Sequence, residues 1–345
     1  MKAAVLVQPG RPLVIEEGIE MPALEPGQVL VRMHYAGICH SQLMEVTGRR
    51  GSDPWLPHLL GHEAAGLVAD TGPGVSKVRP GDAVILTWIR AGGMDVSGAQ
   101  YTHHGKRINS GPVTVFSDYS IVSENRCVRM PAGLPADVAS LFGCAVMTGA
   151  GMVVNTLRPA PGSSMAVLGL GGIGLCALLA ARQLGCAPII GVDIETEKLD
   201  HAKRLGATHL VDARAGKAVE RIRELTGGHG ADYCVEATGR ARGIEEAFMS
   251  VRRGGGRCVF ASHPPHGEMV HLDPFEMICG RHIQGSWGGD SRPDEDIPRY
   301  ATWLLDGTFP VADLITHRYR LEQINVAFED MQARRVGRAL IEFDS

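Results

Sequence analysis

The sequence contains no long apolar run. Among its 345 residues, no stretch reaches the roughly 18 consecutive apolar residues that a membrane-spanning helix needs. The opening segment MKAAVLVQPGRP has only a short apolar run, which Gln8, Pro9 and Gly10 interrupt, so it does not have the form of a secretory signal. We therefore expect a cytoplasmic protein that makes no contact with a membrane.

A large excess of one charge is absent as well. Lys and Arg together number 34 and Asp and Glu number 38, which gives a net charge of −4 at pH 7. Without a basic surface, the chain has no electrostatic means of binding nucleic acid. Its hydrophobic share of 44% and charged share of 21% are ordinary for a globular protein, and its length suffices for two domains.

Disulfide bonds are not expected, because a reducing compartment keeps thiols free. Most of the eight cysteines should then be small buried apolar residues, and Cys176, Cys234 and Cys258 fall in apolar stretches. Glycine is abundant by contrast. The 44 glycines predict many tight turns and close approaches of the backbone.

The pattern of apolar residues divides the chain into three parts. Residues 1–148 contain short β-branched runs separated by Pro and Gly, which predicts a β-rich, barrel-like domain. Strand and helix patterns alternate over residues 149–288, which predicts a doubly wound parallel sheet with crossover helices. Residues 289–345 carry two helical patterns and a final strand. The expected fold class is α/β with a second, β-rich domain.

A glycine motif follows the first strand of the parallel sheet. GLGGIG stands between the strand pattern MAVL and the apolar helix pattern LCALLAARQLG. The first glycine allows a tight turn, the second lets the backbone approach a pyrophosphate, and the third lets helix and strand pack closely. Free N–H groups at the start of the helix favour an anion. The predicted dinucleotide-binding residues are Gly169, Gly171, Gly172, Ile173 and Gly174.

A carboxylate at the end of the next strand pattern, PIIGVD, indicates which dinucleotide is bound. Asp193 follows the last glycine of the motif by about twenty residues, the spacing at which a carboxylate accepts hydrogen bonds from the adenosine ribose. It would also repel a 2′-phosphate, which favours NAD over NADP. Lys198 can reach the same ribose, although a solvated helix lysine is an equally good interpretation.

The segment GHEAAG, residues 61–66, places a histidine beside a glutamate among small residues. Cys39 lies upstream in GICHSQL, and Cys144 lies downstream in LFGCAVMTGAG. Two cysteines and a histidine form one of the ligand sets of catalytic zinc, which keeps a fourth position open. Because Cys39, His62 and Cys144 are far apart in sequence, a purely structural histidine remains the alternative at this point.

Taken in order, these motifs resemble those of the zinc-dependent medium-chain alcohol dehydrogenases, and among them the liver-type branch. The corresponding segments are GICHSQL, GHEAAGLVADTGPGVSKVRPGD, LFGCAVMTGAG, GLGGIGLCALLAARQLG, DLITHRYRLEQINVAFEDM and GRALIEF. The resemblance covers the chain except for residues 90–110. It implies a GroES-like catalytic domain and a Rossmann-type NAD-binding domain, with residues 289–345 returning to the catalytic domain.

The resemblance also implies roles for residues around the metal. Cys39, His62 and Cys144 would bind the catalytic zinc ion. Glu63 would lie beside the metal and take the place of water as a ligand during exchange. Ser41 corresponds to the hydroxyl that hydrogen-bonds the alcohol and takes up its proton.

Further matched positions concern the coenzyme and the substrate. His40 and Arg338 correspond to contacts with the pyrophosphate, and Trp88 and Phe116 correspond to aromatic walls of the substrate pocket. The polyol dehydrogenase branch has a glutamate at the third zinc ligand. Cys144 at that position therefore favours simple alcohols and aldehydes over polyols.

The sequence departs from the family in the lobe that usually holds a structural zinc ion. No cysteine lies between Cys39 and Cys127, so the four cysteines of that lobe are missing and residues 90–110 replace it. The adjacent His103 and His104 do not make a closed tetrahedral site. We expect one zinc ion per chain rather than two.

Two further departures lie close to the expected zinc ligands. Gln42 stands where the family has an aspartate that orients the ligand histidine, and such partners tune metal affinity. Met44 stands where liver-type enzymes have the histidine that passes the proton to solvent. The proton would then leave through ribose hydroxyls and water, or through the neighbouring Glu45, for which a solvated helix glutamate is the alternative interpretation.

The sequence thus predicts a zinc-dependent dehydrogenase that transfers hydride reversibly between a primary or secondary alcohol and NAD. One alternative is a dehydrogenase of thiol adducts, as in the formaldehyde-detoxifying members of the branch. Another is a specialised biosynthetic enzyme in which His263 binds a polar substrate group, and a third is an inactive binding protein of the same fold. A homodimer or homotetramer is expected, with an apolar strand such as residues 256–262 extending a sheet across subunits.

Overall fold

The computed structural model describes residues 1–344. The chain forms two compact units. The β-rich unit comprises Met1–Cys144, Arg292–Leu305 and the chain from Ile315 onward, and the parallel-sheet unit comprises Ala145–Ser291 and Asp306–Leu314. Each unit therefore draws on segments that are distant in sequence.

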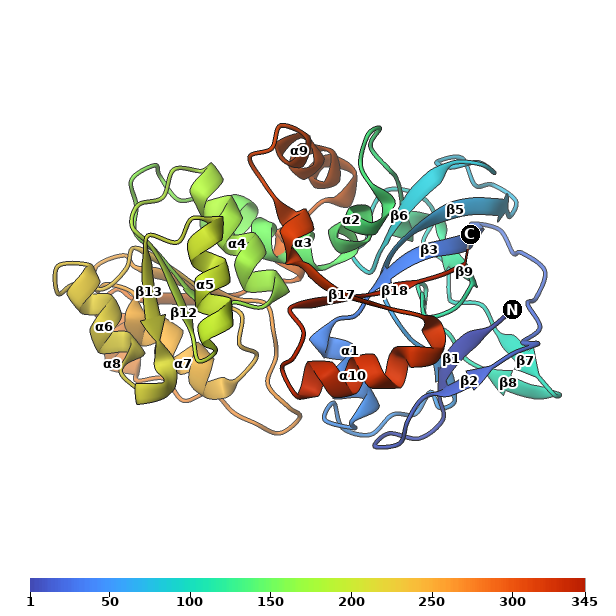
Figure 1. Cartoon of the computed structure of the whole chain (residues 1–345), viewed down its shortest axis with the longest axis horizontal. Coiled ribbons are helices and arrows are strands. Elements are labelled where there is room, and N and C mark those ends of the chain that lie inside the picture. The colour runs from blue at the N-terminus through green and yellow to red at the C-terminus, as the bar shows by residue number, and fades with distance from the viewer. Residues whose placement is uncertain (345) are drawn as a thin grey trace. The chain divides into compact units, whose positions relative to one another are not determined.

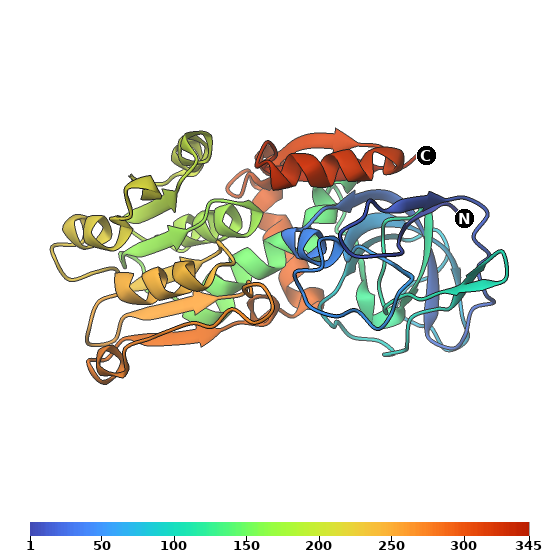
Figure 2. The same cartoon turned by 90° about the horizontal axis from the view of Figure 1, so that it is seen from below.

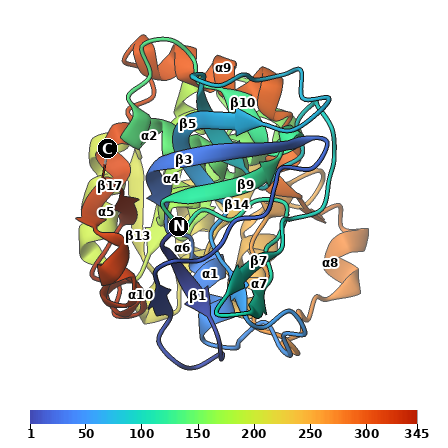
Figure 3. The same cartoon turned by 90° about the vertical axis from the view of Figure 1, so that its right-hand side faces the viewer.

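A seven-stranded sheet forms the centre of the β-rich unit, with strand order β10-β6-β5-β3-β18-β17 and β9 also paired with β3. Figure 3 shows β3 between β5 and β9. Along β3, buried side chains alternate with partly exposed ones for much of its length, which is typical of a strand with one face on the core. The strands are β3 (Gln28–Gly37), β5 (Glu63–Thr71), β6 (Ala83–Thr87), β9 (Tyr119–Ser123), β10 (Cys127–Arg129), β17 (Ile315–Tyr319) and β18 (Arg338–Glu342).

Two small sheets and four α-helices complete the β-rich unit. The small sheets are β2-β1-β4, made of β1 (Ala3–Leu6), β2 (Val14–Glu16) and β4 (His58–Leu59), and the hairpin of β7 (Tyr101–His103) and β8 (Lys106–Ile108). The helices are α1 (His40–Val46), α2 (Ala136–Ser140), α9 (Pro293–Leu305) and α10 (Ile324–Gln332).

Helix α10 has the amphipathic spacing that the sequence predicts. Ile324, Ala327 and Phe328 are buried and belong to the core of the β-rich unit, while intervening residues are exposed. The helix packs against α1, as Figure 1 shows. The strand that follows, β18, pairs with β3 in the seven-stranded sheet.

The second unit is built on a six-stranded parallel sheet, with strand order β13-β12-β11-β14-β15-β16. This order, counted along the chain as 3-2-1-4-5-6, is that of doubly wound dinucleotide-binding folds. Figure 2 shows these strands side by side with helices around them. The strands are β11 (Met165–Leu168), β12 (Ile189–Asp193), β13 (His209–Asp212), β14 (Tyr233–Glu236), β15 (Arg257–Phe260) and β16 (His282–Gly285).

Helices connect the strands of the parallel sheet, and the predicted fold class is confirmed. Helix α4 is apolar on nearly every side because it packs against the sheet, α3 and α5. Helices α6 and α7 pack against each other. The helices are α3 (Ala145–Gly151), α4 (Gly172–Gln183), α5 (Thr196–Leu205), α6 (Ala218–Leu225), α7 (Ala241–Ser250) and α8 (Pro274–Ile278).

Within residues 1–344, no single helix is long and apolar enough to cross a membrane. One bent pair of helical segments, residues 136–143 with residues 145–157, passes that test by length and composition alone. Most of its residues are buried in the protein, and buried core helices of folded proteins often have the same composition.

Candidate functional site

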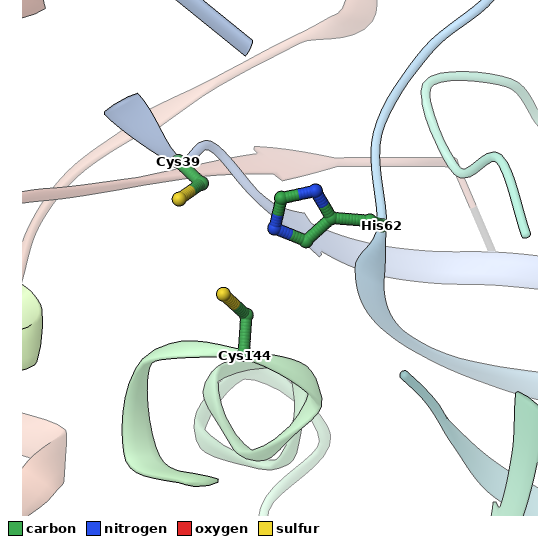
Figure 4. Close-up of side chains that lie close together, drawn as sticks. All are labelled: Cys39, His62 and Cys144. Carbon is green, nitrogen blue, oxygen red and sulfur yellow. The ribbon is translucent and has the colours of Figure 1, made fainter. Parts of the chain in front are cut away.

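Three side chains from separate segments of the β-rich unit converge on one point. The Sγ atoms of Cys39 and Cys144 and a ring nitrogen of His62 all lie within 4.8 Å of one another. Figure 4 shows both sulfur atoms and one nitrogen of the imidazole facing a common space. The structure thus brings together the three residues that the sequence suggested as metal ligands.

Sheet pairing explains the convergence. The end of β3 pairs with the start of β5, with Ala36 opposite Ala64, so Cys39 just after β3 lies near His62 just before β5. The 3-10 helix Leu141–Gly143 is tied to the end of β6 because Thr87 Oγ1 donates a 2.8 Å hydrogen bond to the Gly143 carbonyl. Cys144 follows that carbonyl directly.

The chemistry of the cluster fits a zinc ion. His62 Nε2 is buried and has no hydrogen-bond partner among the described residues. Interactions with Cys144 and His62 hold the pKa of the Cys39 thiol well below its ordinary value. A buried thiolate beside an unpaired imidazole nitrogen calls for a cation, and a Cys₂His set leaves the fourth tetrahedral position open.

Gln42 contacts the other nitrogen of His62. Its Oε1 accepts a 2.9 Å hydrogen bond from the Cys39 N–H, while its Nε2 lies against His62 Nδ1. Metal binding through Nε2 requires that Nδ1 carry the proton, which then needs an acceptor. In the metal-bound state the Gln42 amide must therefore present its oxygen to His62. The aspartate that the family has at this position presents an oxygen to the histidine in either orientation, because both of its terminal atoms are oxygens.

Glu63 is fully buried and forms an ion pair with the guanidinium of Arg338, which is itself buried. The carboxylate fits because two neighbouring positions are glycine. A Cβ at Gly37 would lie 2.7 Å from the Glu63 carboxylate, and a Cβ at Gly143 would lie 2.8 Å from the Glu63 Cβ. The residue predicted to lie beside the metal is thus locked in an ion pair close to the ligand segments.

Arg338 lies buried beside the metal cluster. Its side chain is 7% exposed, its partners are Glu63 and Cys39, and burial lowers its pKa. A guanidinium in this position compensates buried negative charge next to the metal cluster. Its contact with the pyrophosphate stays a prediction. His40, in contrast, is exposed at the start of α1.

The two aromatic residues predicted to line the substrate pocket differ in their surroundings. Trp88 is half-buried, and its ring lies edge-on to that of His62 with the centroids 6.3 Å apart. Phe116 is 1% exposed and packs edge-on against Phe328 inside the core. The structure thus places Trp88 beside a candidate metal ligand and Phe116 in the core of the β-rich unit, and their roles in a substrate pocket stay predictions.

The glycines of GLGGIG have distinct surroundings in the parallel-sheet unit. Gly169 has a φ of +87°, and a Cβ there would lie 2.8 Å from the backbone of residues 237–238. A Cβ at Gly174 would lie 1.8 Å from the Gly169 carbonyl oxygen. A Cβ at Gly171 would meet nothing within 4 Å. Folding therefore requires the first and third glycines, whereas the middle one leaves space at the start of α4 for a ligand.

Asp193 lies at the end of β12, one strand from the glycine loop. Its carboxylate accepts hydrogen bonds from the N–H groups of Leu170 at 2.7 Å, Ile194 at 2.8 Å and Glu195 at 3.0 Å. These bonds fix a negative charge next to the loop. Lys198 is half-buried on α5.

Sequence reasoning missed Glu236 at the end of β14. This carboxylate is fully buried, burial raises its pKa to about 7, and it accepts hydrogen bonds from the Thr238 and Gly239 N–H groups. The loop that it holds is the one that packs against Gly169. The available signal in the sequence was an acidic residue at the end of a strand pattern, followed closely by a glycine, in the segment VEATG.

Comparison with known proteins identifies the family. The model of the alcohol dehydrogenase GroES-like domain matches residues 25–132, and that of the zinc-binding dehydrogenases matches residues 172–306. The chain is 31% identical to the class-3 alcohol dehydrogenase of Cereibacter sphaeroides, with 99% of both chains covered. It is a zinc-dependent alcohol dehydrogenase. An S-(hydroxymethyl)glutathione dehydrogenase of Paracoccus denitrificans is 32% identical over 99% of both chains.

A solved structure of the same family has the same fold. The benzyl alcohol dehydrogenase of Acinetobacter calcoaceticus superposes with a TM-score of 0.90 at 28% identity, with 99% of each chain covered. The predicted family is confirmed, and with it an NAD-dependent oxidoreductase that acts on small-molecule alcohols and uses zinc.

In this alcohol dehydrogenase, residues 90–110 are organised by hydrogen bonds. Glu124 accepts bonds of 2.7–2.8 Å from the N–H groups of Ser76, Lys77 and Met94. Within residues 1–344, two groups of side chains have a geometry that could hold a metal ion, and neither lies in this lobe. His103 Nε2 instead donates to the Glu17 carbonyl at 3.0 Å.

The second such group was not predicted from the sequence of the dehydrogenase. Glu45 on α1, Asp53 in the following loop and His58 at the start of β4 offer atoms within 4.8 Å of one another. No short motif joins them, so only folding reveals the cluster. His263, proposed as a substrate contact, is exposed, and its Nδ1 lies 2.8 Å from the Pro264 carbonyl oxygen.

Proposed function

We propose that Cys39, His62 and Cys144 hold the single zinc ion of this dehydrogenase, and that the site oxidises a simple primary or secondary alcohol. The observation that carries the proposal is the convergence of two thiol sulfurs and an unpartnered imidazole nitrogen within 4.8 Å. Such a set supports a catalytic ion with one open position rather than a closed structural site.

Each residue near the site has a task in this proposal. When bound, zinc supplies a Lewis acid that lowers the pKa of an alcohol, and NAD⁺ supplies the hydride acceptor. Ser41 Oγ, which is buried and has no hydrogen-bond partner, takes up the hydroxyl proton. Trp88 limits access of water beside His62. The Glu63–Arg338 ion pair balances charge beneath the thiolates.

The coenzyme contacts follow from the glycine loop. The open position at Gly171 and the N–H groups that begin α4 suit the pyrophosphate, with Gly172 and Ile173 in the first turn. Asp193 supplies acceptors for the ribose hydroxyls and a charge that disfavours a 2′-phosphate. Lys198, His40 and Arg338 are the remaining candidates for contacts with the coenzyme.

There are two candidates for the substrate of this site. One relative is named for benzyl alcohol and another for S-(hydroxymethyl)glutathione. Trp88 beside His62 supports a compact apolar alcohol. The thiol adduct is the second candidate because the relative named for it is 32% identical over 99% of both chains.

We further propose that the enzyme is a cytoplasmic homo-oligomer, a dimer at the least. None of the eight cysteines forms a disulfide bond, which is typical of a reducing compartment. Strand β16 is an edge of the parallel sheet and is mostly exposed. Phe275, Ile278 and Trp287 nearby are 58–80% exposed and apolar. The strand over residues 256–262 that we had expected to extend the sheet is β15, which is already paired on both sides.

Zinc content and activity of the purified protein test the proposal together. We expect about one zinc per chain and NAD⁺ reduction with benzyl alcohol or ethanol. Turnover of S-(hydroxymethyl)glutathione but not of free alcohols would favour the second candidate. A well-folded protein without zinc would overturn the proposed site.

A further inference from the structure

The Glu45 carboxylate occupies an unusual place on α1. Its side chain is 26% exposed, and no described residue donates a hydrogen bond of 3.5 Å or less to it. His58 Nε2 and an Arg50 nitrogen each lie 3.9 Å away. The carboxylate is thus partly buried, close to Arg50 and His58, and still has acceptor positions free.

The neighbouring His58 and Asp53 have no such freedom. His58 Nδ1 lies 2.9 Å from the Leu59 carbonyl oxygen, and Nε2 lies 2.8 Å from an Asp53 oxygen. The other Asp53 oxygen accepts a 2.9 Å bond from the Trp55 N–H. Both imidazole nitrogens therefore lie against oxygen atoms of the protein. His58 and Asp53 thus already have hydrogen-bond partners, and Glu45 is the member of the cluster that can exchange a proton.

The position of Glu45 along α1 connects it to the reaction. It stands four residues after Ser41, so the two side chains lie on one face of the helix with Cβ atoms about 5–6 Å apart. The connection between them requires a bridging water molecule. Met44, one residue earlier, is buried and cannot carry a proton.

We propose that Glu45 carries the proton of the alcohol from Ser41 to solvent, and that His58 and Asp53 set the charge around it. This inference rests on the proposed function. The hydride leaves the alcohol carbon with both bonding electrons and goes to NAD⁺, while the hydroxyl proton moves to Ser41. The proton of Ser41 passes through water to Glu45, which then releases a proton to bulk water, so every group returns to its starting state.

The electrostatic surroundings suit reversible protonation. Burial has the largest effect on the Glu45 carboxyl and raises its pKa, as Asp53 does. Arg50, His58 and His62 lower the pKa of the same carboxyl. Helix α10, which packs on α1, buries apolar residues there. A carboxyl with a raised pKa exchanges its proton more readily near neutral pH than one fixed by direct hydrogen bonds.

A metal ion is the alternative occupant of the cluster. It would have to displace the bond between His58 and Asp53, whereas His62 Nε2 in the first cluster has no partner to displace. The zinc content of His58→Gln decides the point. Two zinc ions per chain in the wild type, with one lost in His58→Gln, would overturn the proposal.

The main test compares Glu45→Gln with Glu17→Gln, which changes a carboxylate that is 76% exposed and outside the cluster. We expect kcat for benzyl alcohol oxidation by NAD⁺ at pH 7 to fall about 10- to 100-fold in Glu45→Gln only. In Glu45→Ala, added formate should restore part of the rate, because it replaces the lost acceptor. Zinc content and NADH binding should not change.

The pH profile adds a readout that a structural role would not move. His58 lowers the pKa of Glu45, so replacing His58 with a neutral residue favours the protonated carboxyl. His58→Gln should therefore shift the acidic limb of the kcat profile for oxidation to higher pH. An active wild type with the same profile and no formate rescue in the variants would overturn the relay alone. A zinc-loaded wild type inactive on every alcohol would overturn the proposed function, and this inference with it.

Discussion

The enzyme has two clusters that could each accommodate a cation, one at the N-cap of α1 and one around the last turn of the same helix. In the cluster of Cys39, His62 and Cys144, an imidazole nitrogen has no hydrogen-bond partner among residues 1–344. In the cluster of Glu45, Asp53 and His58, the imidazole is already bonded to the Asp53 carboxylate, and the side chains are partly exposed. The first cluster can be completed only by a ligand, whereas the imidazole of the second already has its partner.

The difference shows how ligand type and burial decide what a cluster does. Thiolates buried without a counter-ion are costly, so a metal ion stabilises them strongly. Partly exposed carboxylates beside a histidine can exchange protons with solvent at little cost in free energy. A shared helix therefore positions two clusters with different chemistry.

The largest effect should come from removing a thiolate of the metal cluster. In Cys144→Ala we expect loss of zinc and at least about a 1,000-fold loss of kcat, because the Lewis acid is lost. The matched control is Cys127→Ala, since burial above all raises the pKa of that thiol to about 12 and it lies in neither metal cluster. Elemental analysis and steady-state rates measure both. Retention of zinc in Cys144→Ala would contradict the assignment.

Arg338→Met removes the buried cation on which the metal cluster depends. Glu63 would then be a buried charge without its partner, which costs about 3–5 kcal/mol of folding free energy. Urea denaturation measures the loss. In the control Arg50→Met the side chain is largely exposed beside Glu45, and the change should cost far less. Equal effects of the two substitutions would remove this distinction between the clusters.

Gln42→Asp should make the metal cluster bind zinc more tightly and so widen its difference from the second cluster. A carboxylate accepts the His62 Nδ1 proton without reorienting, so zinc affinity should rise about 10- to 100-fold. Competition with a chelator measures the change, and Gln42→Asn, which keeps the amide, is the control. A weaker affinity in Gln42→Asp would show that the bond to the Cys39 N–H matters more.

Sequence reasoning succeeded where the signal is local. The loop GLGGIG with Asp193 needs only neighbouring elements, and residues predicted on one face of α10 are buried together. It gave no sign that Phe116 packs against Phe328 or that Arg338 pairs with Glu63, since side chains at matched positions can face either a pocket or the core. Burial against Phe328 and Glu63 depends on how distant segments pack.

The sequence by itself determined the strand and helix pattern, the coenzyme loop and the residue types that can bind zinc, because these follow from periodicity and side-chain chemistry. Only the tertiary structure decided that Cys39, His62 and Cys144 meet, since antiparallel pairing of β3 with β5 and the hydrogen bond of Thr87 bring them together. It also decided that Glu45 lies beside His58. Long-range pairing fixes such distances, and no local motif encodes them.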